Sequence, residues 1–444
     1  MTQPHVLLSP LKPAFPEAGG AIDLMVRVQA PPASGQAFAT PKRLALVVDR
    51  SGSMNGQPLA EALKCVEHIA ACMTPQDRLS ITVYDHHANV LMPLAPVASI
   101  EAVKSLLATV DSGGNTNLYG GWEAGSQQLE AGQSGSISRV ILLSDGQANS
   151  GLTDSHAIEA HCRNWLAQGV STTTVGLGRG FNEELMIAMA RAGGGQQYYG
   201  QTAADLFDSF DEELSLLQAL YLRQLRLKLI PAAGVIAEPL GLFDQNPDGS
   251  YHLSDLAWGS ESWLAVRLHL SAGVAGQTRD LLGATVEGTT LQGHAITAHA
   301  PLLSLPGVAQ AVFDAMPADE AIARRLLEVD FAQRSLELSR LVQIGDLRAA
   351  RALLVELTQR FEQHPWLQAK LLRLRTLAER DPEMMRKEAR FSSRKMSSRL
   401  VAHDEMAFSG DETLSAMPAF LRKKTQEGKG REGPAERKGS ESSK

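Results

Sequence analysis

The chain has 444 residues, which is long enough for two or three domains with sizeable hydrophobic cores. Its formal net charge of −7 argues against a general nucleic-acid-binding protein. The first residues lack the basic and apolar regions of a secretory signal, and no stretch approaches the roughly 18 apolar residues of a membrane span. We therefore expect a cytoplasmic protein with no membrane span.

The cysteine pattern supports the same compartment. Cys65 and Cys72 lie on one predicted helix, too far apart for a disulfide, and Cys162 stands alone in a later helix. All three are predicted to be buried thiols in a reducing environment.

The N-terminal residues are predicted to form strands of a β-sandwich. Apolar and polar side chains alternate over Ile22–Val28, which is the period of a half-buried strand. The same period returns over Leu225–Leu229 and Leu264–Leu270, and further strands are expected at Tyr251–Leu256, Asp280–Glu287 and His294–Ala300. A pair of N-terminal strands is too small to fold alone. Residues 1–40 and 220–306 should therefore pair into one sandwich, into which the intervening segment is inserted.

The inserted segment, residues 41–219, alternates strands and helices. The predicted strands are Lys42–Asp49, Arg78–Tyr84, Asn89–Leu94, Arg139–Ser144, Ser171–Gly176 and Gln196–Tyr199. The predicted helices are Gln57–Met73, Ile100–Val110, Leu118–Leu129, Asp154–Ala167, Asn182–Arg191 and Ala203–Ala219. Strands separated by crossover helices indicate an α/β fold with a doubly wound, mostly parallel sheet.

The rest of the chain is predicted to form a helical bundle over residues 307–403. Its four expected helices are Ala318–Val342, Leu347–Phe361, Trp366–Glu379 and Pro382–Leu400. Residues 404–444 are rich in Gly, Ser and charge and are predicted to form a flexible, partly basic tail. The tail is interpreted as an electrostatic arm or as a solubilising extension.

Oxygen-bearing side chains follow the buried strands of the inserted segment. Asp49 ends its first strand, Ser51 and Ser53 come directly after, Thr116 lies in a Gly-rich loop, and Asp145 follows another buried strand. Ligands of doubly wound sheets bind at the carboxyl ends of the strands, where these residues are expected to meet. Hard oxygen atoms suit a small divalent cation, so the sequence predicts a metal site here.

This Asp-x-Ser-x-Ser set, with its loop Thr and strand-ending Asp, resembles the metal-ion-dependent adhesion site of a von Willebrand factor type A (VWA) domain. The resemblance covers roughly residues 41–215, and no position departs from the family pattern. It implies a Rossmann-like domain in which Ser51, Ser53 and either Thr116 or Asp145 bind Mg²⁺ directly, with Mn²⁺ or Ca²⁺ as alternatives. Asp49 would orient hydroxyls and water beside the ion, and a partner carboxylate would fill the open position.

The expected function is therefore a non-enzymatic, Mg²⁺-dependent protein-interaction module or scaffold that binds an Asp or Glu of a partner protein. The resemblance to multidomain bacterial VWA proteins implies a bacterial source, with an ATPase chaperone or kinase and phosphatase signalling proteins as partners. One alternative is a metal-independent scaffold that uses the helical bundle. The other is a phosphohydrolase with Asp49 as nucleophile, which Ser51 disfavours because haloacid-dehalogenase-like enzymes have a second Asp at that position.

Several further residues are candidates for specificity or for a second site. The expected rim residues of the metal site are Arg50, Asn55, Asn117, Tyr119, Gln147 and Asn149. His86 and His87 are interpreted as a solvated turn rather than a metal site, and Gly176–Gly180 as a plain strand-to-helix turn, since it lacks phosphate-loop spacing. The Ser- and Arg-rich segment Arg390–Arg399 is either a phosphorylated or anion-binding segment or a basic helix end.

Overall fold

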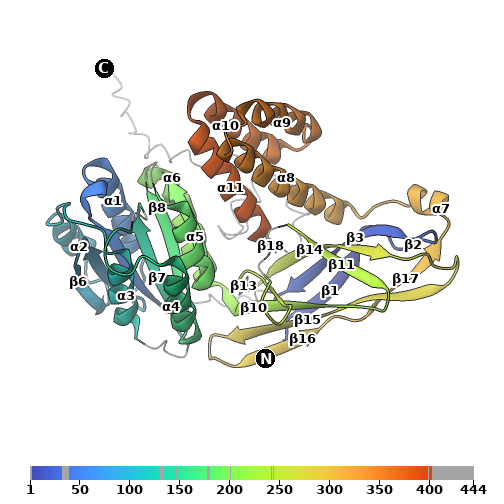
Figure 1. The fold of residues 1–444 in the computed structure, drawn as a ribbon. Helices are drawn as coiled ribbons and strands as arrows, with labels where there is room; N and C mark the ends of the chain where they lie inside the picture. Colours follow the sequence, from blue (N-terminus) through green and yellow to red (C-terminus); the bar gives the residue numbers. More distant parts are fainter. Residues whose placement is uncertain are drawn as a thin grey trace, which may run out of the picture. The chain divides into compact units, whose positions relative to one another are not determined.

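The computed structural model describes residues 3–32, 40–130, 135–145, 148–177, 181–200, 202–241, 243, 245–398 and 400–402. The chain divides into two compact units (Figure 1). The described parts of residues 44–130 and 139–211 form what we call the α/β unit, and those of residues 1–43, 131–138 and 212–402 form the sandwich unit. Among the described residues, no helix combines the length and the hydropathy needed to cross a lipid bilayer.

The α/β unit is built on a six-stranded sheet with the order β6-β5-β4-β7-β8-β9. Its strands are β4 Lys42–Asp49, β5 Arg78–Tyr84, β6 Ala88–Ala95, β7 Ile137–Ser144, β8 Val170–Leu177 and β9 Gly194–Gly200. β5 and β6 are antiparallel, whereas β8 and β9 are parallel. The order reverses at β4, which lies beside β7 in the middle of the sheet, as a doubly wound fold requires.

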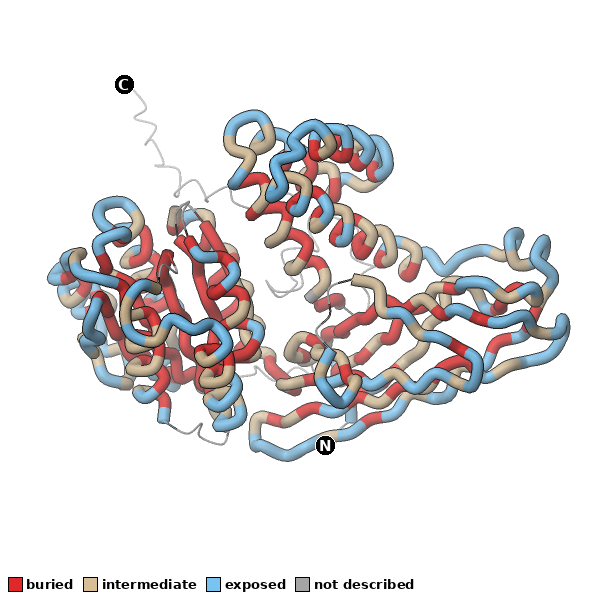
Figure 2. The backbone as a smooth tube through the Cα atoms, in the orientation of Figure 1, coloured by how far each residue is buried: buried red, intermediate tan, exposed pale blue. Residues whose placement is uncertain are grey.

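Crossover helices flank this sheet. They are α1 Gln57–Ala71, α2 Ile100–Leu107, α3 Leu118–Leu129, α4 Ser155–Ala167, α5 Glu183–Ala192 and α6 Ala203–Gln218, with a 3₁₀ turn at Gly52–Met54. α1 contacts α2 and α6, while α4 contacts α3 and α5, so two groups of helices cover the sheet. β4, β7 and β8 are buried along their whole length (Figure 2), which explains why they read as continuous apolar runs. The α/β prediction is confirmed.

The sandwich unit holds two sheets that share one apolar core. The first has the order β1-β3-β14-β11, with β18 beside β14, and consists of β1 His5–Pro10, β3 Gly20–Gln29, β14 Ser260–Leu270, β11 Val235–Leu240 and β18 Val401–Ala402. The second has the order β12-β10-β15-β17-β2, and consists of β12 Tyr251–His252, β10 Leu220–Pro231, β15 Thr278–Thr290, β17 Leu303–Val308 and β2 Phe15–Pro16, with β13 Leu256–Ala257 on β10 and β16 Ala295–His299 on β15.

The pairing of β3 with β14 confirms that the α/β segment is inserted into the sandwich. The two strands run antiparallel from the pair Gly20 and Leu270 to the pair Gln29 and Glu261. Their inward side chains, such as Val26 and Leu264, join those of the second sheet in one buried cluster.

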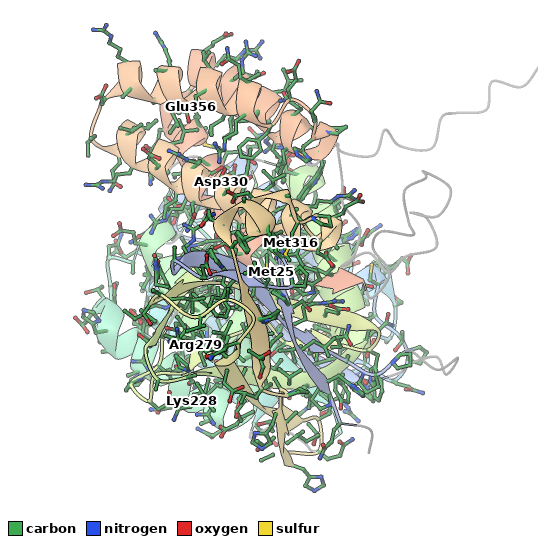
Figure 3. The ribbon with its side chains drawn as sticks, turned by 90° about the vertical axis from the view of Figure 1, so that its right-hand side faces the viewer. Met25, Lys228, Arg279, Met316, Asp330 and Glu356 are labelled. Carbon is green, nitrogen blue, oxygen red and sulfur yellow. The ribbon has the colours of Figure 1, made fainter. Side chains whose placement is uncertain are left out.

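Five helices follow the sandwich strands in the same unit. They are α7 Gln310–Ala315, α8 Glu320–Gln343, α9 Leu347–Arg360, α10 Pro365–Arg380 and α11 Pro382–Ser398. Phe331, Phe361 and Leu371 are fully buried between them. Met25 of β3 packs with α8 residues, including Val329, and Figure 3 shows it beside the helix that carries Asp330. The helical region therefore shares an apolar contact with the sandwich.

Two details differ from expectation, and a third prediction falls outside the described residues. Cys65 and Cys162 are buried, but Cys72 is exposed because it lies one residue past the end of α1, so its predicted burial is wrong. The expected strand Tyr251–Leu256 is two short strands, β12 and β13, because each pairs with a different part of β10. The tail at 404–444 lies outside the described residues.

Candidate metal centre

The sheet brings the predicted oxygen ligands to one edge. Asp49 is the last residue of β4 and Asp145 directly follows β7, and these two strands are neighbours in the sheet. Asp145 is close enough to raise the pKa of Asp49 through charge repulsion. Two carboxylates therefore lie near each other at the carboxyl ends of the central strands.

Three loops are joined at this edge by backbone hydrogen bonds. The loop after β4 and the loop before α3 exchange two of them: Gly113 N donates to Arg50 O at 2.8 Å, and Gly52 N donates to Gly114 O at 3.1 Å. The loop after β7 is joined at Thr116, whose carbonyl accepts hydrogen bonds from Asn149 N and Ser150 N at 3.1 and 3.2 Å. The loops that carry Ser51 and Ser53, Thr116, and Asp145 are thus held together.

Asp49 is held rigidly inside this junction. Its side chain is fully buried, and Oδ1 accepts a hydrogen bond from Ser51 N at 2.9 Å. Oδ2 accepts hydrogen bonds from Ser144 Oγ at 2.6 Å and Tyr84 OH at 3.1 Å. Burial raises the pKa of Asp49, the hydrogen bonds from Ser144 and Ser51 oppose this shift, and Asp145 adds to it. A cation at this edge would favour the ionised form.

The donor set fits a small divalent cation. Ser51 Oγ and Ser53 Oγ are 3.2 Å apart, with Ser51 buried and Ser53 exposed. Thr116 and Asp145 are nearly buried, so the site has inner ligands and an open side. Hydroxyl and carboxylate oxygens, gathered here at one edge of the sheet, are the types of ligand that Mg²⁺ and Ca²⁺ take.

The rim of the centre is charged. Arg50 Nη2 forms an ion pair of 2.7 Å with Asp85 Oδ2, at the end of β5. Burial acts to raise the pKa of Asp85, but the His87 backbone N–H and the Arg50 guanidinium outweigh it, so this pKa is lowered. His86 Nδ1 is 3.0 Å from Asp85 Oδ1, which places the histidine turn at the same edge.

The other rim candidates have structural contacts. Asn55 accepts a hydrogen bond from Ser112, Asn117 caps α3 by accepting from Gly120 N, and Asn149 accepts from Thr116 N at 2.8 Å. The Tyr119 ring packs on that of His161, and Gln147 lies outside the described residues.

The residues that hold Asp49 and Arg50 are not among those predicted from the sequence. Tyr84 and Ser144 are the last residues of β5 and β7, and Asp85 follows β5. Their position at the carboxyl ends of predicted strands indicates that they lie near the metal site. Which of them bonds to Asp49 or to Arg50 depends on side-chain packing, which the sequence pattern does not specify.

Residues 390–398 of the Ser- and Arg-rich segment belong to α11 and are partly inaccessible, and Arg399 lies outside the described residues. Ser392 and Ser393 are buried, and Lys395 forms an ion pair of 3.0 Å with Glu212. These two serines are therefore poor sites for phosphorylation in the folded chain, which favours the basic helix end.

Comparison with known proteins agrees with this architecture. Residues 44–213 match the family model of the von Willebrand factor type A domain. A solved structure titled von Willebrand factor type A from Catenulispora acidiphila is similar with a TM-score of 0.62, at 15% identity, over 89% of this chain and 97% of that chain. The ArnB paralog VWA2 from Sulfolobus acidocaldarius has a TM-score of 0.56, at 17% identity, over 89% of this chain and 99% of that chain.

Curated relatives match smaller parts. The uncharacterized protein sll0103 of Synechocystis is 27% identical over 254 residues, which is 53% of this chain and 59% of the relative. Human inter-alpha-trypsin inhibitor heavy chain H4 is 27% identical over 164 residues, or 35% of this chain and 18% of the relative. The chain thus spans less than two thirds of the length of these relatives.

Proposed function

Residues 44–213 have the fold of a von Willebrand factor type A domain, and we propose that they form a non-enzymatic, metal-dependent protein-binding module. The observation that supports the proposal is the pair of Ser51 and Ser53 hydroxyls beside buried Asp49. Backbone hydrogen bonds hold their loop next to the loops that carry Thr116 and Asp145.

In this proposal Ser51 and Ser53 hold Mg²⁺, together with Thr116 or Asp145, and Mn²⁺ or Ca²⁺ can replace it. Asp49 orients the hydroxyls through the Ser51 backbone hydrogen bond, and Ser144 and Tyr84 fix Asp49. When bound, the ion supplies a positive centre that a carboxylate can approach. With Thr116 rather than Asp145 as the direct ligand, the protein ligands are neutral hydroxyls and offset little of the charge of the ion, so an Asp or Glu of a partner protein would complete the coordination.

The same geometry argues against an enzymatic role for Asp49. Its side chain is fully buried, and both carboxylate oxygens already accept hydrogen bonds. A nucleophile in phosphoryl transfer must reach an incoming phosphorus atom, which Asp49 cannot do without losing those bonds. A phosphohydrolase mechanism through Asp49 is therefore disfavoured.

Metal binding is tested by Mn²⁺ titration of the purified chain, followed by electron paramagnetic resonance of free Mn²⁺. We expect the Ser51→Ala and Thr116→Ala variants to lose at least about tenfold in Mn²⁺ affinity. Mg²⁺ should displace Mn²⁺ from the wild-type chain. Ser112→Ala is the matched control, since it removes a neighbouring loop hydroxyl that bonds Asn55. Equal affinities in all four proteins would refute the metal site.

Partner binding is tested by affinity capture in Mg²⁺ and in EDTA, with Ser51→Ala beside Ser112→Ala. ATPase chaperones and kinase or phosphatase signalling proteins are the first partners to test. A partner lost in EDTA and with Ser51→Ala supports the metal bridge. A partner retained under both conditions favours the metal-independent scaffold, because the helical region exposes large apolar side chains at Ile344, Val355 and Leu372.

A further inference from the structure

A group of three side chains of types that bind metals, a His, a Cys and an Asp, lies at the far end of α1, in the same unit. His68 and Cys72 come from the last turn of α1 and its end, and Asp211 comes from α6. One ligand atom of each lies within 4.8 Å of those of the other two. α1 has 15 residues, or about 22 Å, and begins beside the Ser51–Ser53 loop, so this group is separate from the candidate metal centre.

Helical spacing explains why these side chains converge. His68 and Cys72 are four residues apart and share one face of α1, and Phe207 and Asp211 are four apart on one face of α6. The rings of His68 and Phe207 stack at 4.3 Å with an interplanar angle of 16°. His68 Nε2 lies 3.0 Å from Asp211 Oδ1. The stacked ring thus fixes the imidazole with Nε2 toward the carboxylate.

We propose that His68, Cys72 and Asp211 form a transition-metal site of the zinc type, which joins α1 to α6. A thiolate, an imidazole and a carboxylate are ligands that select Zn²⁺ over Mg²⁺. Metal–ligand bonds of about 2.0–2.3 Å put the ligand atoms of a tetrahedral site about 3–4 Å apart. The three ligand atoms lie within 4.8 Å of one another, so the side chains need to move only slightly closer to bind one ion. Water takes the fourth position, and exposed Cys72 provides the entry path.

The end of α1 also favours a cation. Cys72 N donates hydrogen bonds to His68 O and Ile69 O, so the helix continues to this point. The negative end of the helix dipole then lies beside the site. On binding, the Cys72 thiol proton passes to solvent, and the proton that His68 Nε2 donates to Asp211 moves through solvent to Nδ1, so that Nε2 is free to bind the metal. The bound metal would link α6 to α1 and stabilise the α/β unit.

The test is a Co²⁺ and Zn²⁺ titration of the full chain in excess Mg²⁺, which keeps the oxygen-ligand centre from taking up the probe. Co²⁺ should produce a near-ultraviolet thiolate charge-transfer band, and Zn²⁺ should abolish it. Cys72→Ser should remove the band, and His68→Ala and Asp211→Asn should weaken Zn²⁺ binding by at least about tenfold.

Two controls keep the test specific. Cys162→Ala removes a buried thiol of α4 and should leave the band unchanged. Ser51→Ala should also retain the band, because the proposal does not depend on the candidate metal centre. The absence of a thiolate band in the wild-type chain, or its persistence in folded Cys72→Ser, would overturn the proposal.

Discussion

Glu61 is a nearly buried carboxylate of α1 that joins this helix to the first turn of α6. On α1, its Oε2 accepts a hydrogen bond of 2.7 Å from Ala203 N, the first residue of α6, and its Oε1 lies 2.8 Å from Lys64 Nζ. Burial acts to raise the pKa of Glu61, but the Ala203 N–H and Lys64 outweigh it, so the pKa falls below its ordinary value of 4.5. The ionised form is therefore favoured by folding.

This linkage gives a pH-dependent prediction. Because the folded pKa is depressed, the stabilisation is fully present above pH 4.5 and is lost as the pH falls through the folded pKa. Glu61→Gln should lower the free energy of unfolding by about 1–2 kcal/mol at neutral pH, and the difference should shrink below pH 4.5. Urea denaturation at several pH values measures this. Glu67→Gln, which removes the same charge from the same helix, serves as control, and a pH-independent difference would contradict the linkage.

At the same scale, the sequence predicted the candidate ligands but not their support. Asp49 and Asp145 were predicted to lie at strand ends, and only a few residue types have the oxygen atoms that can bind a small divalent cation. By contrast, the hydrogen bonds from Tyr84 and Ser144 to Asp49 depend on the pairing of β5 and β7 with β4. The approach of His68 to Asp211 depends on the packing of α1 against α6 and could not be read from a linear pattern.

Between elements, the approach of α3 to the sheet depends on glycine. A Cβ built on Gly125 would lie 2.2 Å from Val47 Cγ2 of β4, and one on Gly121 would lie 2.3 Å from the Tyr84 ring. Val47 is fully buried and has a stiff, β-branched side chain, so it has little room to move. α3 therefore packs closer to β4 and β5 than a larger residue would permit.

We predict that Gly125→Ala lowers the free energy of unfolding by about 1–3 kcal/mol through overpacking. The higher helix propensity of Ala offsets this by at most about 1 kcal/mol, so the clash should prevail. In Gly113→Ala the new methyl group meets no atom within 4 Å, and stability should change by less than about 0.5 kcal/mol. Urea denaturation measures the free energy of unfolding of both variants. Equal values would show that α3 can shift away from β4 without loss of stability.

Long elements were predictable and short ones were not. The predicted bounds of α8, α9 and α10 agree with the structure within two residues at each end, because Gly345, Asp346 and Pro365 punctuate the chain. β18, at Val401–Ala402, has only two residues and exists because it pairs with Ser260 and Glu261 of β14. Such a strand is defined by a distant partner, and no local period indicates it.

At the scale of the whole chain, the sandwich must close across the inserted α/β segment. Glu261 of β14 lies at this closure and is fully buried. It accepts two hydrogen bonds of 2.8 Å from Arg27 of β3, which is 234 residues away, and others from Gln29 and Trp263 at 2.6 and 2.7 Å. Closing so long a loop costs entropy, which the β3–β14 pairing and this network offset.

Glu261→Ala should therefore loosen the sandwich specifically. It leaves Arg27 without its buried partner, and since Arg27 is 23% exposed and can be partly hydrated, we expect a loss of about 2–3 kcal/mol rather than the 3–5 kcal/mol typical of a fully buried pair. Hydrogen exchange should rise along β3 and β14 but stay unchanged in β4 and β7. Glu238→Ala breaks an exposed pair with His269 in the same sheet and should cost less than about 1 kcal/mol. Equal exchange in the two variants would mean that apolar pairing alone closes the sandwich, whereas faster exchange in β4 and β7 would mean that the inserted unit relies on that closure to fold.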